Sequence, residues 1–330
     1  MTLNISWLTS RKAPCFEWFI SSLLRQLKGD FTDIQIIVVD YWLQEIPHHN
    51  WTTDDATKRR TAWQAMIPSG LQCVLTNPKP TPWQGPHRLT KNDYFAAANT
   101  RNTAICFAKD GHLAYVDDLS VLCSEWLQAV REACGANRIT AGAFKKHKNL
   151  VVENGEAKSF DVYEPGMDSR WSHGRDYAIP CPPTWLFGCS LVAPVERFLE
   201  VNGWAEICDS GGLGLEDCSM GIAWANHGHQ LWYDRRMLTY ESEERHFQQP
   251  SMRRIDKKKD GTVTIPGYGT HPDEKGHHLV RVLSKAKRFT NYFEPGGIER
   301  LRQRILSGEP FPVILEPRHD WHDSQPLEQL

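Results

Sequence analysis

Strand-like and helix-like segments alternate through the first 120 residues, and this alternation limits the folds that the chain can adopt. The run Ile34–Val39 is apolar apart from Gln35 and rich in β-branched residues, which is typical of a buried parallel strand. The spacing of apolar residues predicts further strands and helices, so that elements are expected at residues 4–9, 15–27, 34–39, 71–75, 95–107 and 112–116. This order predicts an α/β fold with a mostly parallel, doubly wound central sheet flanked by helices.

Polar residues directly follow several of the expected strands. Thr9–Arg11 follow the first strand, Asp40 follows the second, and Asp117–Asp118 follow the fourth. In open α/β sheets, ligands bind at the carboxyl ends of the strands. We therefore expect these residues to converge on one cleft.

The composition is that of a globular protein. The 330 residues are 40% apolar and 24% charged, which allows a sizeable core. The nine cysteines contain no CxxC pair, which favours reduced thiols over disulfides or a zinc site. The sequence has no signal-peptide pattern and no apolar run of roughly 18 residues, so a soluble, cytoplasmic protein without a membrane span is expected.

Positive charge is concentrated near the C-terminus. Residues 251–304 hold thirteen Lys or Arg against six Asp or Glu, although the whole chain has a net charge of −2. We expect a catalytic domain at 1–250, with halves at about 1–120 and 121–250, followed by a basic extension and tail at 251–330. The extension is either a solvated lid or a polyanion surface, with candidate contacts at Arg253, Arg254, Lys257, Lys258 and Lys259.

Two acidic pairs are candidates for chemistry. Asp117–Asp118 follow a buried strand, where carboxylates need a cation or solvent; they are either Mg²⁺ or Mn²⁺ ligands or a solvated helix cap. Glu216–Asp217 follow a glycine-rich segment, and a carboxylate there is either a general base or another helix cap. His246 is a metal ligand or a structural histidine.

Together these motifs resemble the GT-A glycosyltransferases, in particular the inverting, family-2-like enzymes. Ala97–Asn102 looks like the family's helix with an Arg-Asn pair, and Tyr115–Asp118 is similar to its DxD-type motif. Asn202–Trp204 and Gly214–Asp217 are similar to its acceptor-side signature. The resemblance covers about residues 3–248 and implies a GT-A fold.

The resemblance also implies roles on the donor side. Ser10 and Arg11 would lie near the nucleotide, and Asp40 would contact its base. Arg101 would approach the diphosphate or the base, while Asp117 would help to position the ribose or the donor sugar.

The remaining implied roles concern the metal and the acceptor. Asp118 would bind the metal directly, with His246 as a further ligand; Leu119 stands where the family often has a third acidic residue. Asp217 would be the general base and Glu216 its acceptor-binding partner. Other acceptor-side contacts are expected at Trp204, Gly212 and Trp185.

The implied reaction is metal-dependent, inverting transfer of a sugar from a nucleoside-diphosphate donor, with UDP favoured, to an acceptor hydroxyl. The acceptor stays open: a hydroxymethylated DNA base would suit a polyanion surface, and a saccharide, lipid or protein remains an alternative. A non-catalytic nucleotide-sugar-binding protein and a nucleotidyltransferase are competing hypotheses.

Overall fold

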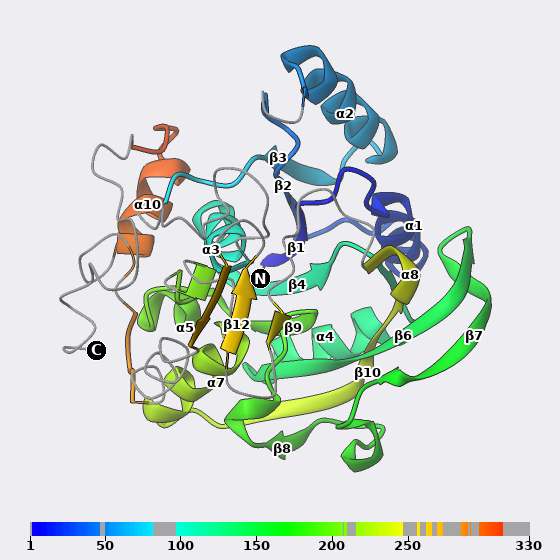
Figure 1. Ribbon diagram of the computed structural model, residues 1–330, viewed down its shortest axis with the longest axis vertical. Helices are drawn as coiled ribbons and strands as arrows, with labels where there is room; N and C mark the ends of the chain where they lie inside the picture. The colour runs from blue at the N-terminus through cyan, green and yellow to red at the C-terminus, as the bar shows by residue number, and fades with distance from the viewer. Residues whose placement is uncertain are drawn as a thin grey trace.

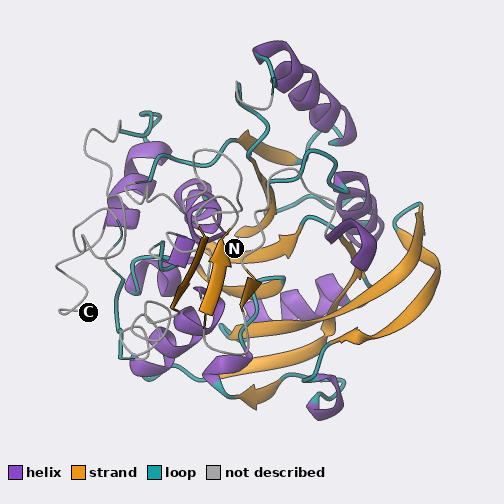
Figure 2. Cartoon of the chain, viewed as in Figure 1, coloured by secondary structure: helices purple, strands orange, loops and turns teal. Residues whose placement is uncertain are grey.

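The computed structural model describes residues 2–46, 50–81, 97–206, 208–209, 216–246, 256–257, 262–265, 269–272, 285–289, 291 and 297–312. Most of the strands within these residues form one ten-stranded sheet, with helices on both faces (Figures 1 and 2). None of the helices in these ranges is long and apolar enough to cross a membrane.

The first half of the sheet is parallel, in the order β3-β2-β1-β4. The strands are β1 (Thr2–Thr9), β2 (Ile34–Asp40), β3 (Gln72–Thr76) and β4 (Gly111–Asp117). The connections contain α1 (Phe16–Leu27), α2 (Thr53–Met66) and α3 (Ala97–Phe107). The α/β alternation predicted from the sequence is confirmed here. Leu8 of β1 pairs with Asp117 of β4, so the ends of these strands lie side by side.

The second half of the sheet is mixed. It contains β5 (Ser120–Leu122), β6 (Ile139–Glu153), β7 (Glu156–Met167), β8 (Ile179–Cys181), β9 (Ser190–Pro194) and β10 (Leu231–Ser242). Strand β9 runs antiparallel between β4 and β6, whereas β10 runs parallel to β6. A separate antiparallel sheet consists of β11 (Asp256–Lys257), β12 (Thr262–Ile265) and β13 (Gly269–Pro272).

Two hydrophobic cores cover the two faces of the large sheet. One contains apolar residues of α1 and α4 (Trp126–Gly135), packed with the parallel strands. The other contains residues of α3, α5 (Val195–Glu200), α7 (Glu216–Asn226) and α10 (Gly297–Leu306). Figure 1 shows these two groups of helices on opposite sides, with the long β6–β7 hairpin curving around the outside.

The segment 180–194 contains several Pro and Gly residues, but it is only partly irregular. Residues 183–185 form a single 3-10 turn, but Ser190–Pro194 form β9, which is buried throughout. Val192 faces both Ala114 of β4 and Thr140 of β6. Because Pro and Gly residues flank it, the sequence pattern did not indicate this short strand, which joins the two halves of the sheet.

Candidate active site

Asp118 lies at the carboxyl end of β4. Its carboxylate accepts hydrogen bonds from residues at the end of the neighbouring strand β1 and in the loop after it. Thr9 Oγ1 donates to Asp118 Oδ2 at 2.7 Å, and Arg11 Nε donates to Oδ1 at 2.9 Å. The carboxylate is largely buried, so Arg11 supplies the charge that compensates it. Each carboxylate oxygen has two lone pairs, which leaves Asp118 able to accept a further ligand.

Asp117 is the more accessible member of the pair, with a side chain that is 35% exposed. Partial burial raises the pKa of its carboxyl to about 6, with Asp118 and Asp217 adding to the increase and Arg101 opposing it. Negative charge is therefore in excess around Asp117, which is where an additional cation would be stabilised.

Glu241, on β10, contributes to this excess although the sequence assigned it no role. Burial, followed by the charge of Asp117, raises the pKa of its carboxyl to about 8. Glu241 pairs in register with Ser120 of β5 and Lys146 of β6, so the sheet itself holds it close to the ends of the strands. The signal available in the sequence was an acidic residue within a strand, but the strand was not predicted there.

Glu216 and Asp217 begin helix α7, and Arg101 of α3 joins them to the other acidic pair. Arg101 Nη1 lies 2.9 Å from Glu216 Oε1 and 3.0 Å from Asp217 Oδ1, and Nη2 lies 4.0 Å from Asp117 Oδ1. The structure thus places the two acidic motifs, about a hundred residues apart in sequence, around one arginine.

Trp204 was expected to contact the acceptor, but the structure places it elsewhere. Its ring is fully buried beneath Arg101, with the guanidinium carbon 4.7 Å from the ring centre. Trp204 Nε1 also donates to Tyr115 Oη at 3.3 Å. A fully buried ring cannot touch an acceptor, so Trp204 supports the arginine instead. Trp185 is half-buried against Tyr233, and its acceptor role stays a prediction.

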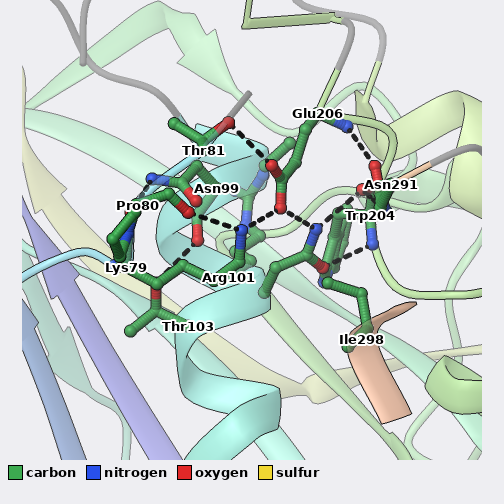
Figure 3. A network of polar contacts seen from close by, with 12 residues as sticks. Lys79, Pro80, Thr81, Asn99, Arg101, Thr103, Trp204, Glu206, Asn291 and Ile298 are labelled. Carbon is green, nitrogen blue, oxygen red and sulfur yellow. Dashed lines mark hydrogen bonds and ion pairs between the residues drawn. The ribbon is translucent and has the colours of Figure 1, made fainter. Parts of the chain in front are cut away.

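A buried polar network lies beside Arg101 (Figure 3). Glu206 forms an ion pair with Lys79 and accepts from Thr81 Oγ1 at 2.8 Å and Asn102 Nδ2 at 2.8 Å. Asn291 Nδ2 donates to the Trp204 carbonyl at 2.7 Å. These contacts fix the loop that carries Trp204 against α3, the helix that carries Arg101.

The C-terminal segment is anchored to the same loop. Asn202 Nδ2 donates to the Phe289 carbonyl at 2.7 Å, and its Oδ1 accepts from the Ile298 amide at 3.0 Å. Arg302 of α10 bonds the Ala108 carbonyl at 2.9 Å. The described residues of the extension therefore help to stabilise the candidate site through this loop and through the residue that follows α3.

Arg11 also connects Asp118 to the region of His246. Its Nη1 donates to the Arg245 carbonyl at 2.9 Å, within the short helix α8 (Glu243–His246). Arg245 Nη1 in turn lies 3.0 Å from Cys15 Sγ. The backbone of His246 is consequently held near the acidic motif, while its side chain lies outside what the structure describes.

Asp40 does not have the position expected of a nucleotide contact. It is fully buried and accepts from Trp63 Nε1 at 2.8 Å, from the Trp42 amide at 2.9 Å and from Arg59. These three donors satisfy its carboxylate within the loop after β2, and the contact of Asp40 with the base stays a prediction. Ser10 is also buried, and its carbonyl accepts from Trp42 Nε1 at 2.7 Å.

Several predicted site residues lie outside the described residues. They are Gly212, Arg253, Arg254, Lys258 and Lys259, whereas Lys257 is described only through its backbone in β11. Their predicted contacts with an acceptor or a polyanion stay predictions.

The carboxylate oxygens of Asp117 and Asp118 are suitable ligands for a hard divalent cation. Mg²⁺ and Mn²⁺ prefer oxygen ligands and commonly use only one or two protein carboxylates, leaving positions for phosphates. Asp117 offers an accessible carboxylate, and Asp118 retains lone pairs beside it. Within the described residues, no three His, Cys, Asp or Glu side chains are arranged as a complete metal cage. Such a cation would therefore depend on phosphate oxygens or on side chains outside those residues.

Comparisons with known proteins found similarity to solved structures alone. No protein-family model and no curated protein matches the sequence. The chain is similar to S. aureus TarS at 11% identity and a TM-score of 0.46, covering 73% of this chain and 37% of TarS. It is similar to TarS 1–349 in complex with UDP at 14% identity and a TM-score of 0.44, covering 73% and 60%.

A further similar structure is the mannosyltransferase PcManGT from Pyrobaculum calidifontis in complex with GDP-Man and Mn²⁺. The identity is 14% and the TM-score 0.46, covering 72% of this chain and 56% of that one. The chain thus spans less than two thirds of each of these three structures.

Proposed function

We propose that the protein is a metal-dependent glycosyltransferase that moves a sugar from a nucleoside-diphosphate donor to an acceptor hydroxyl with inversion. The observation that carries this proposal is the arrangement of Asp117–Asp118 and Glu216–Asp217 around Arg101. One pair offers oxygen ligands for a cation that holds a diphosphate. The other offers a carboxylate that can receive a proton.

The bound cation would neutralise the charge that develops on the diphosphate leaving group. Asp117 and Asp118 would hold it, and Arg11 keeps Asp118 in place. Asp217, with a side chain that is 25% exposed, is accessible enough to take the acceptor's proton as general base. Attack from the side opposite the leaving group would then invert the anomeric centre in a single displacement.

The acceptor is a second question, for which charge is the available guide. The excess of Lys and Arg in residues 251–304 favours a polyanion, and a hydroxymethylated DNA base is one such acceptor. Duplex DNA would have to present that base outside the stack. Binding to DNA that weakens steeply with salt would support this acceptor, whereas turnover with a saccharide, lipid or protein alone would exclude it.

Thermal shift with a panel of nucleotides tests the donor proposal. UDP, GDP and their sugar conjugates are added with Mn²⁺ or with EDTA, and Asp118→Asn is compared with Asp110→Asn, which alters an exposed carboxylate. We expect one nucleotide to raise the Tm of the wild-type protein and of Asp110→Asn in Mn²⁺ only, and Asp118→Asn to lose that increase. No shift with any nucleotide would contradict the proposal.

Release of free sugar separates an enzyme from a binding protein. A transferase supplied with the stabilising donor and no acceptor generally passes sugar to water at a slow rate, so nucleoside diphosphate should accumulate. Tight, Mn²⁺-dependent nucleotide binding without any turnover, with or without the acceptor classes above, would instead favour the non-catalytic alternative.

A further inference from the structure

Arg101 has surroundings that differ from those of an arginine that reaches a substrate. Its side chain is only 4% exposed although it lies among three carboxylates. Its Nη1 atom bonds both Glu216 and Asp217, while Nε has no hydrogen-bond partner among the described residues. A buried guanidinium is stable here because it is paired with these carboxylates.

Two further groups pack against the guanidinium. The Trp204 ring lies on one side, in cation–π contact at 4.7 Å. The backbone of Gly188 also lies close to the guanidinium, and an added Cβ there would stand 2.3 Å from Arg101 Nη2 and 2.4 Å from Cζ. Only glycine leaves room for the guanidinium at this place. The side chain is therefore fixed by packing as well as by charge.

We propose that Arg101 is a positioning residue that fixes the Glu216 and Asp217 carboxylates at the start of α7, and so sets the geometry of the general base. This inference rests on the proposed function, in which Asp217 receives the acceptor's proton. It replaces the role that the sequence resemblance implied, a contact between Arg101 and the donor diphosphate or base. To reach a diphosphate, Arg101 would have to leave two ion pairs and the Trp204 ring.

Two variants test the position of the guanidinium by different means. Arg101→Lys keeps the positive charge but removes the planar fork that bonds two carboxylates at once. Gly188→Ala keeps Arg101 but displaces it. Arg236→Lys is the matched control, because Arg236 is also a largely buried arginine that bonds two carboxylates, those of Asp234 and Glu132, and neither belongs to the acidic motifs.

The readouts are kcat, the KM for the donor, and the Kd for UDP or GDP with Mn²⁺ measured by calorimetry. A misplaced base should lower kcat by about 10²-fold in either variant, since displacement of catalytic groups by about 1 Å has effects of this size. The donor KM and the nucleotide Kd should stay at the wild-type values. Arg236→Lys should keep the wild-type kcat.

Two results would overturn the inference. One is a wild-type kcat in a folded Arg101→Lys or Gly188→Ala protein. The other is a nucleotide Kd that rises in proportion to the loss of kcat, because that would identify Arg101 as a donor contact.

A stability measurement separates this inference from the proposed function and needs no activity. In a double-mutant cycle of Arg101→Lys and Glu216→Gln, the two changes should be coupled by about tenfold in the unfolding equilibrium constant. If the effects of the two substitutions on the unfolding equilibrium constant are additive, Arg101 does not fix Glu216, even in an active enzyme. Coupling in a protein that turns over no nucleotide sugar would contradict the proposed function and leave the positioning contact intact.

Discussion

The Nε atom of Arg11 donates to Asp118 Oδ1 at 2.9 Å, while its Nη1 donates to the Arg245 carbonyl at 2.9 Å. One side chain thus links the loop after β1 to the acidic motif and to α8. It also occupies part of the carboxylate that the proposed cation would use. Arg11 therefore compensates the charge of Asp118 whether or not a cation is bound.

Arg11→Gln should destabilise the metal-free protein by about 3 kcal/mol, because it leaves Asp118 largely buried without its cation. Mn²⁺ should restore stability by binding beside Asp118, so it should raise the Tm of the variant more than that of the wild-type protein. Melting curves in EDTA and in Mn²⁺ measure both effects. Arg25→Gln is the control, because Arg25 pairs with Glu156 at the surface. An equal Mn²⁺ shift in Arg11→Gln and wild type would contradict the prediction.

Lys79→Met should lower the free energy of unfolding by about 3–5 kcal/mol. The substitution leaves Glu206 fully buried with hydroxyl and amide donors but no cation. Lys158→Met removes the cation of an exposed pair with Glu156 and should cost at most about 1 kcal/mol. Urea unfolding of both variants measures the two losses. A similar loss of stability in both would show that the buried ion pair contributes no more to the free energy of unfolding than the exposed one.

Glu241→Gln should change how stability depends on pH. The folded-state pKa of Glu241 is about 8 against an ordinary value of 4.5, so the carboxyl favours folding at low pH, and this contribution is lost as the pH rises through about 8. Glutamine does not ionise. The variant should therefore gain stability relative to the wild-type protein between about pH 5 and about pH 8 in EDTA.

Thermal melts at the two pH values give the difference in Tm. Glu125→Gln changes an exposed glutamate and serves as the control. If the Tm difference between Glu241→Gln and wild type is the same at both pH values, the surroundings of Glu241 do not raise the pKa of its carboxyl.

The sequence predicted the parallel half of the fold because its signals are local. Strand β2 is a buried run of mainly β-branched residues, and α1 shows apolar residues at helical spacing along its length. Helix α2 was missed because its sequence is polar nearly throughout, and the capping box of Thr52 and Asp55 is its clearest mark. Strand β10 was not predicted, because the charged residues around Arg235 interrupt the apolar pattern at a bulge.

The candidate site was predictable in its residues but not in its contacts. Asp117–Asp118 and Glu216–Asp217 stood out as acidic pairs next to expected elements. No local pattern indicates that Arg101 bridges two motifs about a hundred residues apart, or that Trp204 lies beneath it. Such pairings follow from the order of strands in the sheet, and β9, the strand that joins its halves, was not predicted.

Turnover by Asp217→Asn, measured together with nucleotide binding, tests the central claim most directly. Asp176→Asn is the matched control, because Asp176 also pairs with an arginine but is 82% exposed. We expect Asp217→Asn to lose about 10²- to 10⁴-fold in sugar transfer while it binds the donor nucleotide and Mn²⁺ as the wild-type protein does. Transfer by Asp217→Asn at close to the wild-type rate would contradict the assignment of Asp217 as the base and the mechanism built on it.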